Sequence, residues 1–346
     1  MSELLLQPVR LFIAGYGTVG KALVKIIREN HDTIARRTGK DLRICGLANS
    51  RRYLIDREGV KPEWLSEGTA GCFFDALADL SPADAVMIDC TASEEPGLRY
   101  PQLFKAGYSV AACNKIPFSG SYENYAALTA AAARAHVGLR YETTVGAALP
   151  ILAALDRLAV SGDTLCCVEA VLSGTLNYLC DGYEGHDFAA LVEDARQKGY
   201  TEPDPAIDLS GRDVLRKTLI LARVAGIPLE ESDVCLEPFP AEDDLAAAYV
   251  SAQAAGRRLR YVASVRRKGS LACPGHGPTA EEKAGQWVVA VGLQAVGPGS
   301  PLYSLTGTDN CAVMTTADYP SPLVIRGAGA GPRQTAAGLL QDILSL

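Results

Sequence analysis

The sequence predicts an α/β protein in which the first domain is a doubly wound parallel sheet. One observation is a glycine-rich turn between a buried strand and a helix, within residues 9–27. Another is the alternation of strand and helix patterns up to residue 141, which is typical of parallel sheets. The chain has 346 residues, which is too long for one ordinary domain and suits two.

The glycine-rich turn has the GxGxxG pattern in the context that a Rossmann domain requires. A strand at residues 9–14 precedes it, and the helix that follows carries apolar side chains on one side. The first glycine permits a tight turn, the second lets a pyrophosphate approach, and the third lets helix pack on strand. The alternative is a merely structural glycine turn. We predict that a dinucleotide is bound by Gly15, Gly17, Thr18, Val19 and Gly20.

The end of the next strand, residues 42–48, indicates which nicotinamide cofactor is preferred. An NAD-selective site would place an Asp or Glu there, to bind the ribose hydroxyls. This chain has Asn49, Ser50, Arg51 and Arg52 instead, whose hydroxyl and guanidinium groups suit a 2′-phosphate. NADP(H) is therefore favoured over NAD(H). The alternative is that both arginines are ordinary loop charges.

Two further expected strands, residues 85–91 and 108–113, end in polar side chains. Helical patterns lie between and after them, most clearly at residues 122–135. Strand ends in a doubly wound sheet face the ligand crevice, so Thr91 and Lys115 should lie near the cofactor. Lys115 should lie towards the nicotinamide. The alternative for this lysine is a plain surface charge.

The segment 199–217 combines an acid-rich loop with a lysine, which suits binding of a zwitterionic small molecule and proton transfer. Pro203 and Pro205 exclude helix and regular sheet from its first half, so the loop should be extended and fixed. The charged residues of the segment that we single out are Glu202, Asp204, Asp208, Asp213 and Lys217.

A helix should begin in the second half of this segment. Ser210 followed by Asp213 resembles a capping box, and Gly226 with Pro228 should end the helix. Asp213 and Lys217 then lie four residues apart on one face. The alternative is a solvated surface ion pair, but a surface helix does not need the stiff acidic loop that precedes it.

Three small-residue turns are also candidates for function. The turn at 143–150, with Glu142 beside it, could direct main-chain carbonyls at a small cation, although the residues alone favour an ordinary crossover between domains. Residues 173–178 offer hydroxyl and amide groups that could meet a polar substrate or simply cap a helix. Glycine-rich residues 327–331 precede a helix from Thr335, which should return to the first domain, although the loop could also be a plain tight connection.

Composition narrows the class of protein further. A net charge of −7 and a pI near 5.3 argue against nucleic acid or an anionic membrane as partner. No apolar run has the length of a bilayer span, and the N-terminus lacks the pattern of a signal peptide. The ten cysteines are scattered without metal-ligand spacing, which indicates reduced thiols in a cytoplasmic protein.

Taken in order, the motifs of the chain resemble those of the homoserine dehydrogenase family over nearly its full length. They are GYGTVG (15–20), DCT (89–91), NK (114–115), ETTVGAALP (142–150), LSGTLNY (172–178), GYTEPDPAIDLSGRDVLRK (199–217) and GAGAGPRQTAAG (327–338). The long central stretch is highly specific. The resemblance is especially close to the dehydrogenase part of bifunctional aspartokinase–homoserine dehydrogenases, and we expect neither a kinase nor a regulatory domain here.

The resemblance implies an NAD(P)-dependent reduction of L-aspartate 4-semialdehyde to L-homoserine, in the biosynthesis of threonine and methionine. It implies a Rossmann domain over residues 1–141, to which 327–346 return. An α/β substrate and dimerisation domain with an open sheet should occupy residues 142–326. A homodimer is implied, and a tetramer is possible.

The resemblance also assigns roles by position. Lys217 would donate the proton, with Lys115 at the reaction centre and Asp213 supporting the lysine. Four residues would bind substrate: Glu202, Asp208, Gly174 and Thr175. Cofactor contacts would come from Val19, Thr91, Lys115 and Gly331. A sodium-type cation would be held by Glu142, Val145, Ala147 and Leu149.

Two rival classes remain on the sequence alone. A semialdehyde dehydrogenase that acts through a covalent intermediate would pair a cysteine nucleophile with a histidine, and Cys113 is the only cysteine near the expected crevice. A non-catalytic NADP-binding sensor would keep GYGTVG but has no reason to keep Lys217 among carboxylates.

Overall fold

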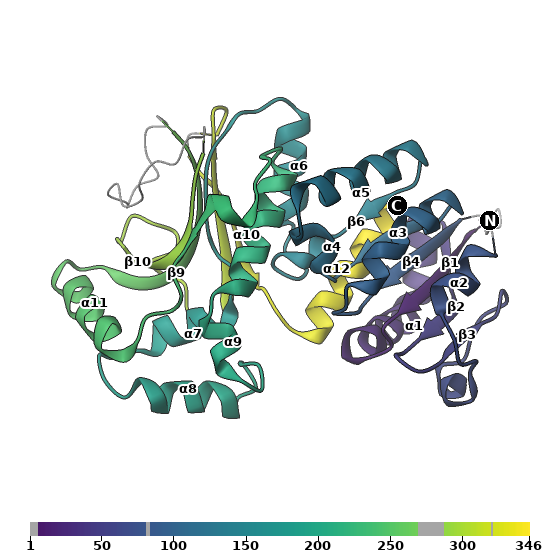
Figure 1. Cartoon of the computed structure of the whole chain (residues 1–346), viewed down its shortest axis with the longest axis horizontal. Coiled ribbons are helices and arrows are strands. Elements are labelled where there is room, and N and C mark those ends of the chain that lie inside the picture. The colour runs from purple at the N-terminus through teal and green to yellow at the C-terminus, as the bar shows by residue number, and fades with distance from the viewer. Residues whose placement is uncertain (1–5, 81–83, 269–286, 320) are drawn as a thin grey trace. The chain divides into compact units, whose positions relative to one another are not determined.

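The structure is a computed structural model, shown in Figure 1, which describes residues 6–80, 84–268, 287–319 and 321–346. It contains two compact units. The first consists of Met1–Ala148 with Gly331–Leu346, and the second of Leu149–Ala330. The boundary therefore falls a few residues later than our sequence-based value of 141. Within the described residues, no helix combines the length and the apolar character that a membrane span needs.

The first unit is a six-stranded sheet in the order β3-β2-β1-β4-β5-β6. All neighbouring pairs are parallel except β2 with β3. The strands are β1 (Gln7–Ala14), β2 (Lys40–Ala48), β3 (Tyr53–Ile55), β4 (Ala85–Asp89), β5 (Ser109–Ala112) and β6 (Leu139–Arg140). This confirms the predicted doubly wound sheet, because the order reverses between β1 and β4.

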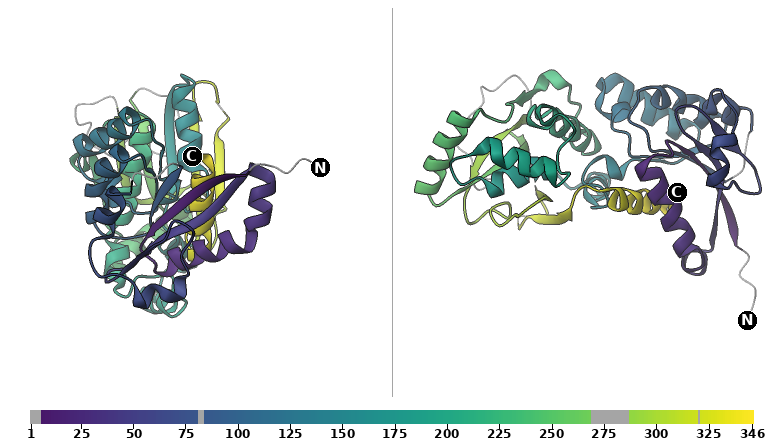
Figure 2. Two further views of the ribbon diagram at one scale, coloured as in Figure 1. Left: turned by 90° about the vertical axis from the view of Figure 1, so that its right-hand side faces the viewer. Right: turned by 90° about the horizontal axis from the view of Figure 1, so that it is seen from below.

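Helices cover both faces of this sheet (Figure 2). The helices α1 and α12 pack together on one face, while α3 contacts both α2 and α5 on the other. The helical segments are α1 (Thr18–Thr38), η1 (Pro62–Glu67), α2 (Phe73–Ala78), α3 (Glu95–Lys105), α4 (Ile116–Ser119), α5 (Tyr122–Arg134), η2 (Glu142–Thr144) and α12 (Pro332–Ser345). The C-terminal helix thus belongs to the first unit, and its apolar side chains complete the core that α1 and β1 form.

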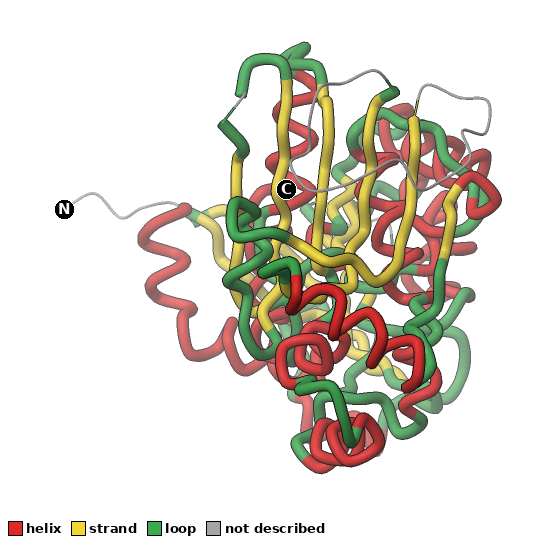
Figure 3. Tube along the Cα trace, turned by 90° about the vertical axis from the view of Figure 1, so that its left-hand side faces the viewer, coloured by secondary structure: helices red, strands yellow, loops and turns green. Residues whose placement is uncertain are grey.

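The second unit is a mixed six-stranded sheet in the order β12-β11-β7-β9-β10-β8, and its long strands lie side by side in Figure 3. Only β8 with β10 is a parallel pair. The strands are β7 (Leu165–Val171), β8 (Val234–Leu236), β9 (Arg258–Arg267), β10 (Trp287–Val296), β11 (Asp309–Thr316) and β12 (Leu323–Ala328).

Three of the helices of the second unit, α7, α10 and α11, pack against the central strand β9. The helical segments are α6 (Ile151–Val160), α7 (Gly174–Gly182), α8 (Phe188–Gln197), α9 (Pro205–Leu209), α10 (Arg212–Val224), η3 (Glu231–Asp233) and α11 (Glu242–Ala254). Four of these strands, β8 to β11, come after α10, in a part of the chain where local sequence patterns do not reveal the pairing that neighbouring strands supply.

The acidic segment differs from the sequence-based prediction at two points. Pro205 does not exclude helix but starts α9, since the first helical position needs no N–H donor. The side chain of Asp204 caps this helix by accepting the N–H of Ala206 at 3.0 Å. The next helix, α10, is capped by Gly211 in the left-handed region, so Ser210 is not its N-cap.

The cysteines also differ in one case from the expectation of reduced thiols. Eight described cysteines are free, as expected: Cys45, Cys72, Cys90, Cys113, Cys166, Cys180, Cys235 and Cys311. In contrast, Cys167 on β7 is disulfide-bonded. The glycine- and proline-rich stretch 273–278 lies outside the described residues.

Candidate active site

The glycine-rich turn of the first unit has the geometry that a dinucleotide loop needs. Gly15 has a φ of +90°, and a Cβ there would lie 2.7 Å from the carbonyl carbon and oxygen of Cys90. A Cβ on Gly20 would lie 2.5 Å from the carbonyl oxygen of Gly15, so the helix packs closely only because this residue is glycine. In contrast, a Cβ on Gly17 would meet nothing within 4 Å.

The space beside Gly17, which no atom of the described residues fills, lies at the start of α1. Gly17 is its N-cap and offers no side-chain hydrogen bond to the first turn, which begins at Thr18. The N–H groups of this turn therefore face a ligand position with favourable helix-dipole charge. The residues present fit a pyrophosphate at this place, as the sequence predicts.

The two arginines after β2 differ in their surroundings. The side-chain oxygen of Asn49 accepts the backbone N–H groups of Arg51 at 2.8 Å and Arg52 at 2.9 Å, which fixes the turn. The guanidinium of Arg52 then donates to the carbonyl oxygen of Gly68 at 2.6 Å. Because one nitrogen of the Arg52 guanidinium is already bonded to the backbone, Arg51 is the better candidate to bind a 2′-phosphate.

A buried carboxylate joins the ends of β4 and β5, a feature to which sequence reasoning gave no role. Asp89 is fully buried and accepts hydrogen bonds from the hydroxyl of Tyr100 at 2.6 Å and from the Nδ2 of Asn114 at 3.0 Å. Its other oxygen accepts the N–H of Thr91 at 2.8 Å. Burial, together with the charge of Asp89, raises the pKa of Tyr100 far above its ordinary value.

This network positions the two predicted cofactor residues at the strand ends. Thr91 is held through its N–H, and its hydroxyl accepts a second bond from Asn114 at 3.3 Å. Lys115 directly follows Asn114 and is the N-cap of α4. The sequence did contain a signal for this network, namely a carboxylate at the end of an otherwise apolar strand. A buried charge without partners is costly, so such a residue indicates that hydrogen-bond donors surround it.

In the second unit, Lys217 lies on α10 with two of its ammonium hydrogens engaged. Its Nζ donates to the carbonyl oxygen of Leu172 at 2.7 Å and pairs with a carboxylate oxygen of Asp213 at 2.8 Å. The lysine side chain is 13% exposed, whereas that of Asp213 is 48% exposed. A solvated surface pair would not bury the lysine or tie it to a strand end, so the surface-pair alternative is wrong for this geometry.

The acidic loop lies next to this lysine. Asp208, on α9, accepts the backbone N–H of Glu202 at 2.8 Å, and its environment includes Asp213 and Lys217. Loss of solvent raises the pKa of Asp208 above its ordinary value, against the opposing effect of the Glu202 N–H. The side chain of Glu202 itself is exposed.

The start of α7 forms another part of these surroundings. Ser173 caps the helix by accepting the N–H of Leu176 at 3.2 Å, so the helix-cap alternative holds for this residue. The hydroxyl of Thr175 donates to the carbonyl oxygen of Tyr200. A Cβ on Gly174 would lie 2.8 Å from the carbonyl oxygen of Thr308, so a side chain there would displace the start of β11.

The turn predicted to hold a cation has an uncommon backbone. Gly146 and Ala147 both have positive φ, of 79° and 53°. The left-handed region is strained for a side chain such as that of Ala147, and strain of this kind concentrates at functional sites. The carbonyl oxygen of Ala147 points at α12, because a Cβ on Gly338 would lie 3.0 Å from it. Leu149 directs its carbonyl to the N–H of Ile151 at 2.8 Å.

A second carboxylate lies beside Glu142. Asp342 on α12 is 6% exposed, and its Oδ2 accepts the backbone N–H of Glu142 at 3.1 Å. Burial raises the pKa of Asp342 to about 7, and the negative charge of Glu142 contributes in the same direction. Sequence reasoning missed Asp342, because nothing in the local pattern of α12 connects it to residue 142.

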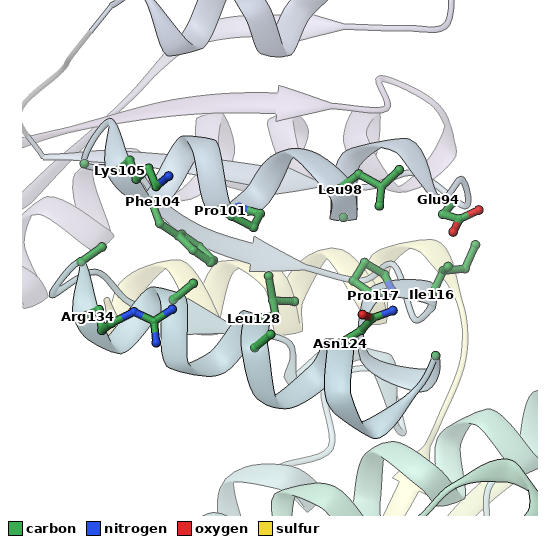
Figure 4. Close-up of a pocket in the computed structure, with 16 residues that line it drawn as sticks. Glu94, Leu98, Pro101, Phe104, Lys105, Ile116, Pro117, Asn124, Leu128 and Arg134 are labelled. Atoms are coloured by element: carbon green, nitrogen blue, oxygen red, sulfur yellow. The ribbon is translucent and has the colours of Figure 1, made fainter.

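A pocket of about 790 Å³ lies elsewhere on the first unit, between α3 and α5 (Figure 4). Leu98 and Pro101 line it from α3, Pro117 from α4, and Leu128 from α5. None of the residues predicted to bind cofactor, substrate or cation lines this pocket. Within the described part of the chain, no cluster of three or more His, Cys, Asp or Glu side chains could hold a metal ion.

Comparison with known protein families finds a matching family model for each of the two units. Residues 15–142 match the family model described as "Homoserine dehydrogenase, NAD binding domain". Residues 150–344 match the model described as "Homoserine dehydrogenase". The chain belongs to the homoserine dehydrogenase family. Members are NAD(P)-dependent oxidoreductases, which confirms the resemblance and the enzyme class that the sequence predicts.

Curated relatives of the homoserine dehydrogenase family cover nearly the whole chain. The bifunctional aspartokinase/homoserine dehydrogenase of Haemophilus influenzae is 34% identical over 97% of this chain. The match spans only 42% of that protein, which is its dehydrogenase part. The homoserine dehydrogenase of Schizosaccharomyces pombe is 31% identical over 98% of this chain and 95% of its own length.

Solved structures agree with this family fold. A Candida auris protein of unknown function superimposes with a TM-score of 0.84 and 28% identity, covering 98% of each chain. A hyperthermophilic archaeal homoserine dehydrogenase in complex with NADPH has a TM-score of 0.76 and 23% identity, over 98% of this chain and 97% of its own. The latter likeness shows the fold alone.

We predict that Asp342→Asn removes a pH-dependent loss of stability. The folded-state pKa of Asp342 is about 7 and the ordinary value 3.8, so its stabilising contribution is present below the lower value and is lost as pH rises through about 7. Relative to its position at pH 5, the variant should gain about 3 kcal/mol of stability over the wild type by pH 8, because about two pH units separate pH 5 from the folded-state pKa and each is worth ~1.4 kcal/mol.

Urea unfolding at several pH values between 5 and 8 measures this difference. Asp79→Asn is the matched control, since Asp79 is an exposed aspartate of the same unit. A constant difference between wild type and Asp342→Asn at every pH would contradict the raised pKa.

Proposed function

We propose that this chain catalyses the reversible NAD(P)H-dependent reduction of L-aspartate 4-semialdehyde to L-homoserine. The observation that carries the proposal is Lys217, a nearly buried lysine fixed beside carboxylates in a chain of the homoserine dehydrogenase family. A bound nicotinamide supplies a hydride to the aldehyde carbon. The chain must then stabilise and protonate the aldehyde oxygen.

Lys217 is suited to that task. An ammonium group has three hydrogens, of which Leu172 and Asp213 occupy two in this structure. The third can point at the substrate oxygen, stabilise the charge that develops there and deliver the proton. Asp213 acts as the support that holds the lysine. Lys115, at the cofactor edge of the first unit, is the other candidate for the reaction centre.

The acidic loop supports binding of an amino-acid substrate. The substrate's ammonium needs a negative partner, and Asp208 is a partly desolvated carboxylate next to Lys217. A cation bound there would offset the cost of that desolvation. Glu202 adds a second carboxylate. Gly174 and Thr175, at the start of α7, would line the same position.

The cofactor would lie on the glycine-rich turn, in contact with Gly15, Gly17, Thr18, Val19 and Gly20. Thr91, Lys115 and Gly331 would add contacts, since Gly331 is the N-cap of α12. We favour NADP(H) because Arg51 and Arg52 stand where an NAD-selective site would carry an acidic residue.

A sodium-type cation would be held by Glu142 and the carbonyl groups of Val145, Ala147 and Leu149. The consecutive left-handed residues Gly146 and Ala147 turn the chain sharply and support this proposal. The Glu142 and Asp342 pair supports it as well, because two neighbouring carboxylates favour a cation.

We also propose that the protein works as a homodimer, with a tetramer as a further possibility. Support comes from one face of the second sheet, on which Arg266 and Gln294 both lie by their register in the β9–β10 pair. The buried Nε of Arg266 and Oε1 of Gln294 have no hydrogen-bond partner among the described residues. A second copy that covers this face could supply partners, since buried polar atoms are normally satisfied.

The rival chemistry through a cysteine nucleophile gains no support. The thiol of Cys113 forms a hydrogen bond with the thiol of Cys90, whereas that chemistry needs a histidine as its base. A non-catalytic sensor would not need a lysine that is largely buried and held by two contacts, as Lys217 is.

Lys217→Met should lower kcat by about two to four orders of magnitude, the range for loss of a general acid, while NADPH affinity stays normal. Steady-state kinetics with aspartate semialdehyde and fluorescence titration of NADPH measure the two quantities. Lys198→Met is the matched control, because Lys198 pairs with Asp194 on the surface of the same unit. Near-normal turnover of Lys217→Met would move the proton donor to Lys115 or to water.

Arg51→Ala should weaken NADPH by about tenfold, the range for one hydrogen bond to a charged group, and leave NADH unchanged. Arg52→Ala should affect NADPH less and lower the Tm, because its guanidinium also binds the carbonyl of Gly68. Fluorescence titrations with NADPH and NADH measure the affinity of each variant for both cofactors. If Arg51→Ala weakens both cofactors equally, the preference for NADP(H) does not arise from this turn.

Sodium chloride should raise the Tm at pH 8 more than choline chloride does at equal ionic strength. The reason is that a cation at Glu142 would offset its repulsion with Asp342. The difference should vanish in Glu142→Gln, as followed by differential scanning calorimetry. Equal effects of the two salts on the wild type would argue against the cation site.

A further inference from the structure

Two free cysteines form a cross-strand pair at the cofactor edge of the first unit. Cys90 follows β4 and Cys113 follows β5, and the parallel register pairs Asp89 with Ala112, so the cysteines are the next pair in line. The N–H of Cys113 still bonds the carbonyl oxygen of Asp89 at 3.0 Å, which continues the ladder to this point.

The spacing of this pair suits a disulfide. Neighbouring strands lie about 4.8 Å apart, which is inside the range of about 4.4–6.8 Å that Cα atoms of disulfides span. The two thiols also act on one another, since each is the leading cause of the shift in the other's pKa. Each residue as a whole keeps part of its surface exposed, although both thiols are largely removed from solvent.

The two thiols are not equivalent. The hydrogen bond from Cys90 lowers the pKa of Cys113, and the charge of Lys115 contributes in the same direction. The same hydrogen bond and burial raise the pKa of Cys90. Since the thiolate is the nucleophile, Cys113 attacks first and Cys90 resolves.

We propose that Cys90 and Cys113 are a reversible redox pair, oxidised to a disulfide by low-molecular-weight disulfides. The Cys113 thiolate attacks one sulfur of the oxidant, forms a mixed disulfide and releases the first thiolate, which takes up a proton. The sulfur of Cys90 then attacks the sulfur of Cys113, and its proton goes to the second departing thiolate. The protein loses two electrons and two protons, and the oxidant becomes two thiols.

The position of the pair couples its oxidation to the cofactor. The carbonyl group of Cys90 lies directly against Gly15, with no room for even a Cβ between them. Thr91 and Lys115 follow the two cysteines closely in the chain. Drawing the sulfur atoms together to bond length therefore shifts the backbone beneath the dinucleotide turn. The disulfide should weaken nicotinamide dinucleotide binding, and bound cofactor should slow its formation.

Oxidised glutathione is the probe. The wild type is treated with it, freed of reagent and compared with the untreated protein by peptide mass mapping and NADPH fluorescence titration. We expect a Cys90–Cys113 linked peptide and a fall in NADPH affinity of about tenfold or more, because displacements on the order of 1 Å cost this much at a positioned site. Dithiothreitol should restore the affinity, and saturating NADPH should delay oxidation.

Variants test the order of attack and the assignment. Cys90→Ser should stop at a glutathione adduct on Cys113, and Cys113→Ser should keep its NADPH affinity through the treatment. Cys72→Ser is the matched control, because Cys72 is a partly buried free cysteine of the same unit. It should respond like the wild type.

Two outcomes would overturn the inference. One is the absence of the linked peptide in treated wild type, and the other is a linked peptide without any change in NADPH affinity. The two readouts are peptide mass and NADPH affinity. Failure of this inference can therefore be told from failure of the proposed function, which is tested by turnover.

Discussion

The ends of β4 and β5, where we propose that the cofactor binds, depend on the buried carboxylate of Asp89. Its two oxygens accept hydrogen bonds from Tyr100, Asn114 and Thr91, and these partners come from α3 and from the ends of two strands. Removing one partner of a buried charge typically costs about 3–5 kcal/mol, because the remaining charge is left without compensation. The positions of Thr91 and Lys115, and the approach of Cys90 to Gly15, all follow from this fixed point.

Lys217 in the second unit depends on how α10 is fixed at its two ends. At the start, Gly211 lies so close to Tyr261 that a Cβ would come within 2.1 Å of its hydroxyl, which donates to the carbonyl of Glu237 at 2.5 Å. At the other end, the buried guanidinium of Arg223 binds the carbonyl of Leu229 at 2.9 Å. A helix anchored at both ends holds a lysine rigidly, as the proposed role of Lys217 as proton donor requires.

Charge is placed differently in the two units. The carboxylate partner of Lys217 is Asp213, one turn earlier in the same helix, so the pair is built in locally. Asp342 and Glu142 are two acids brought together from positions far apart in the chain, and burial makes one of them hold its proton near neutral pH. That arrangement costs stability as pH rises, a cost that proteins accept mainly where function needs it.

The sequence by itself determined the features that depend on short-range order. GYGTVG between strand and helix established the dinucleotide turn, and the spacing of Asp213 and Lys217 placed both on one helical face, because backbone periodicity alone fixes such relations. Tertiary structure decided the rest. Arg52 binds the carbonyl of Gly68, Cys90 lies beside Cys113, and Asp342 accepts the N–H of Glu142. Each of these depends on which segments pack together, and burial, which sets the pKa of a carboxyl or a thiol, exists only once they do.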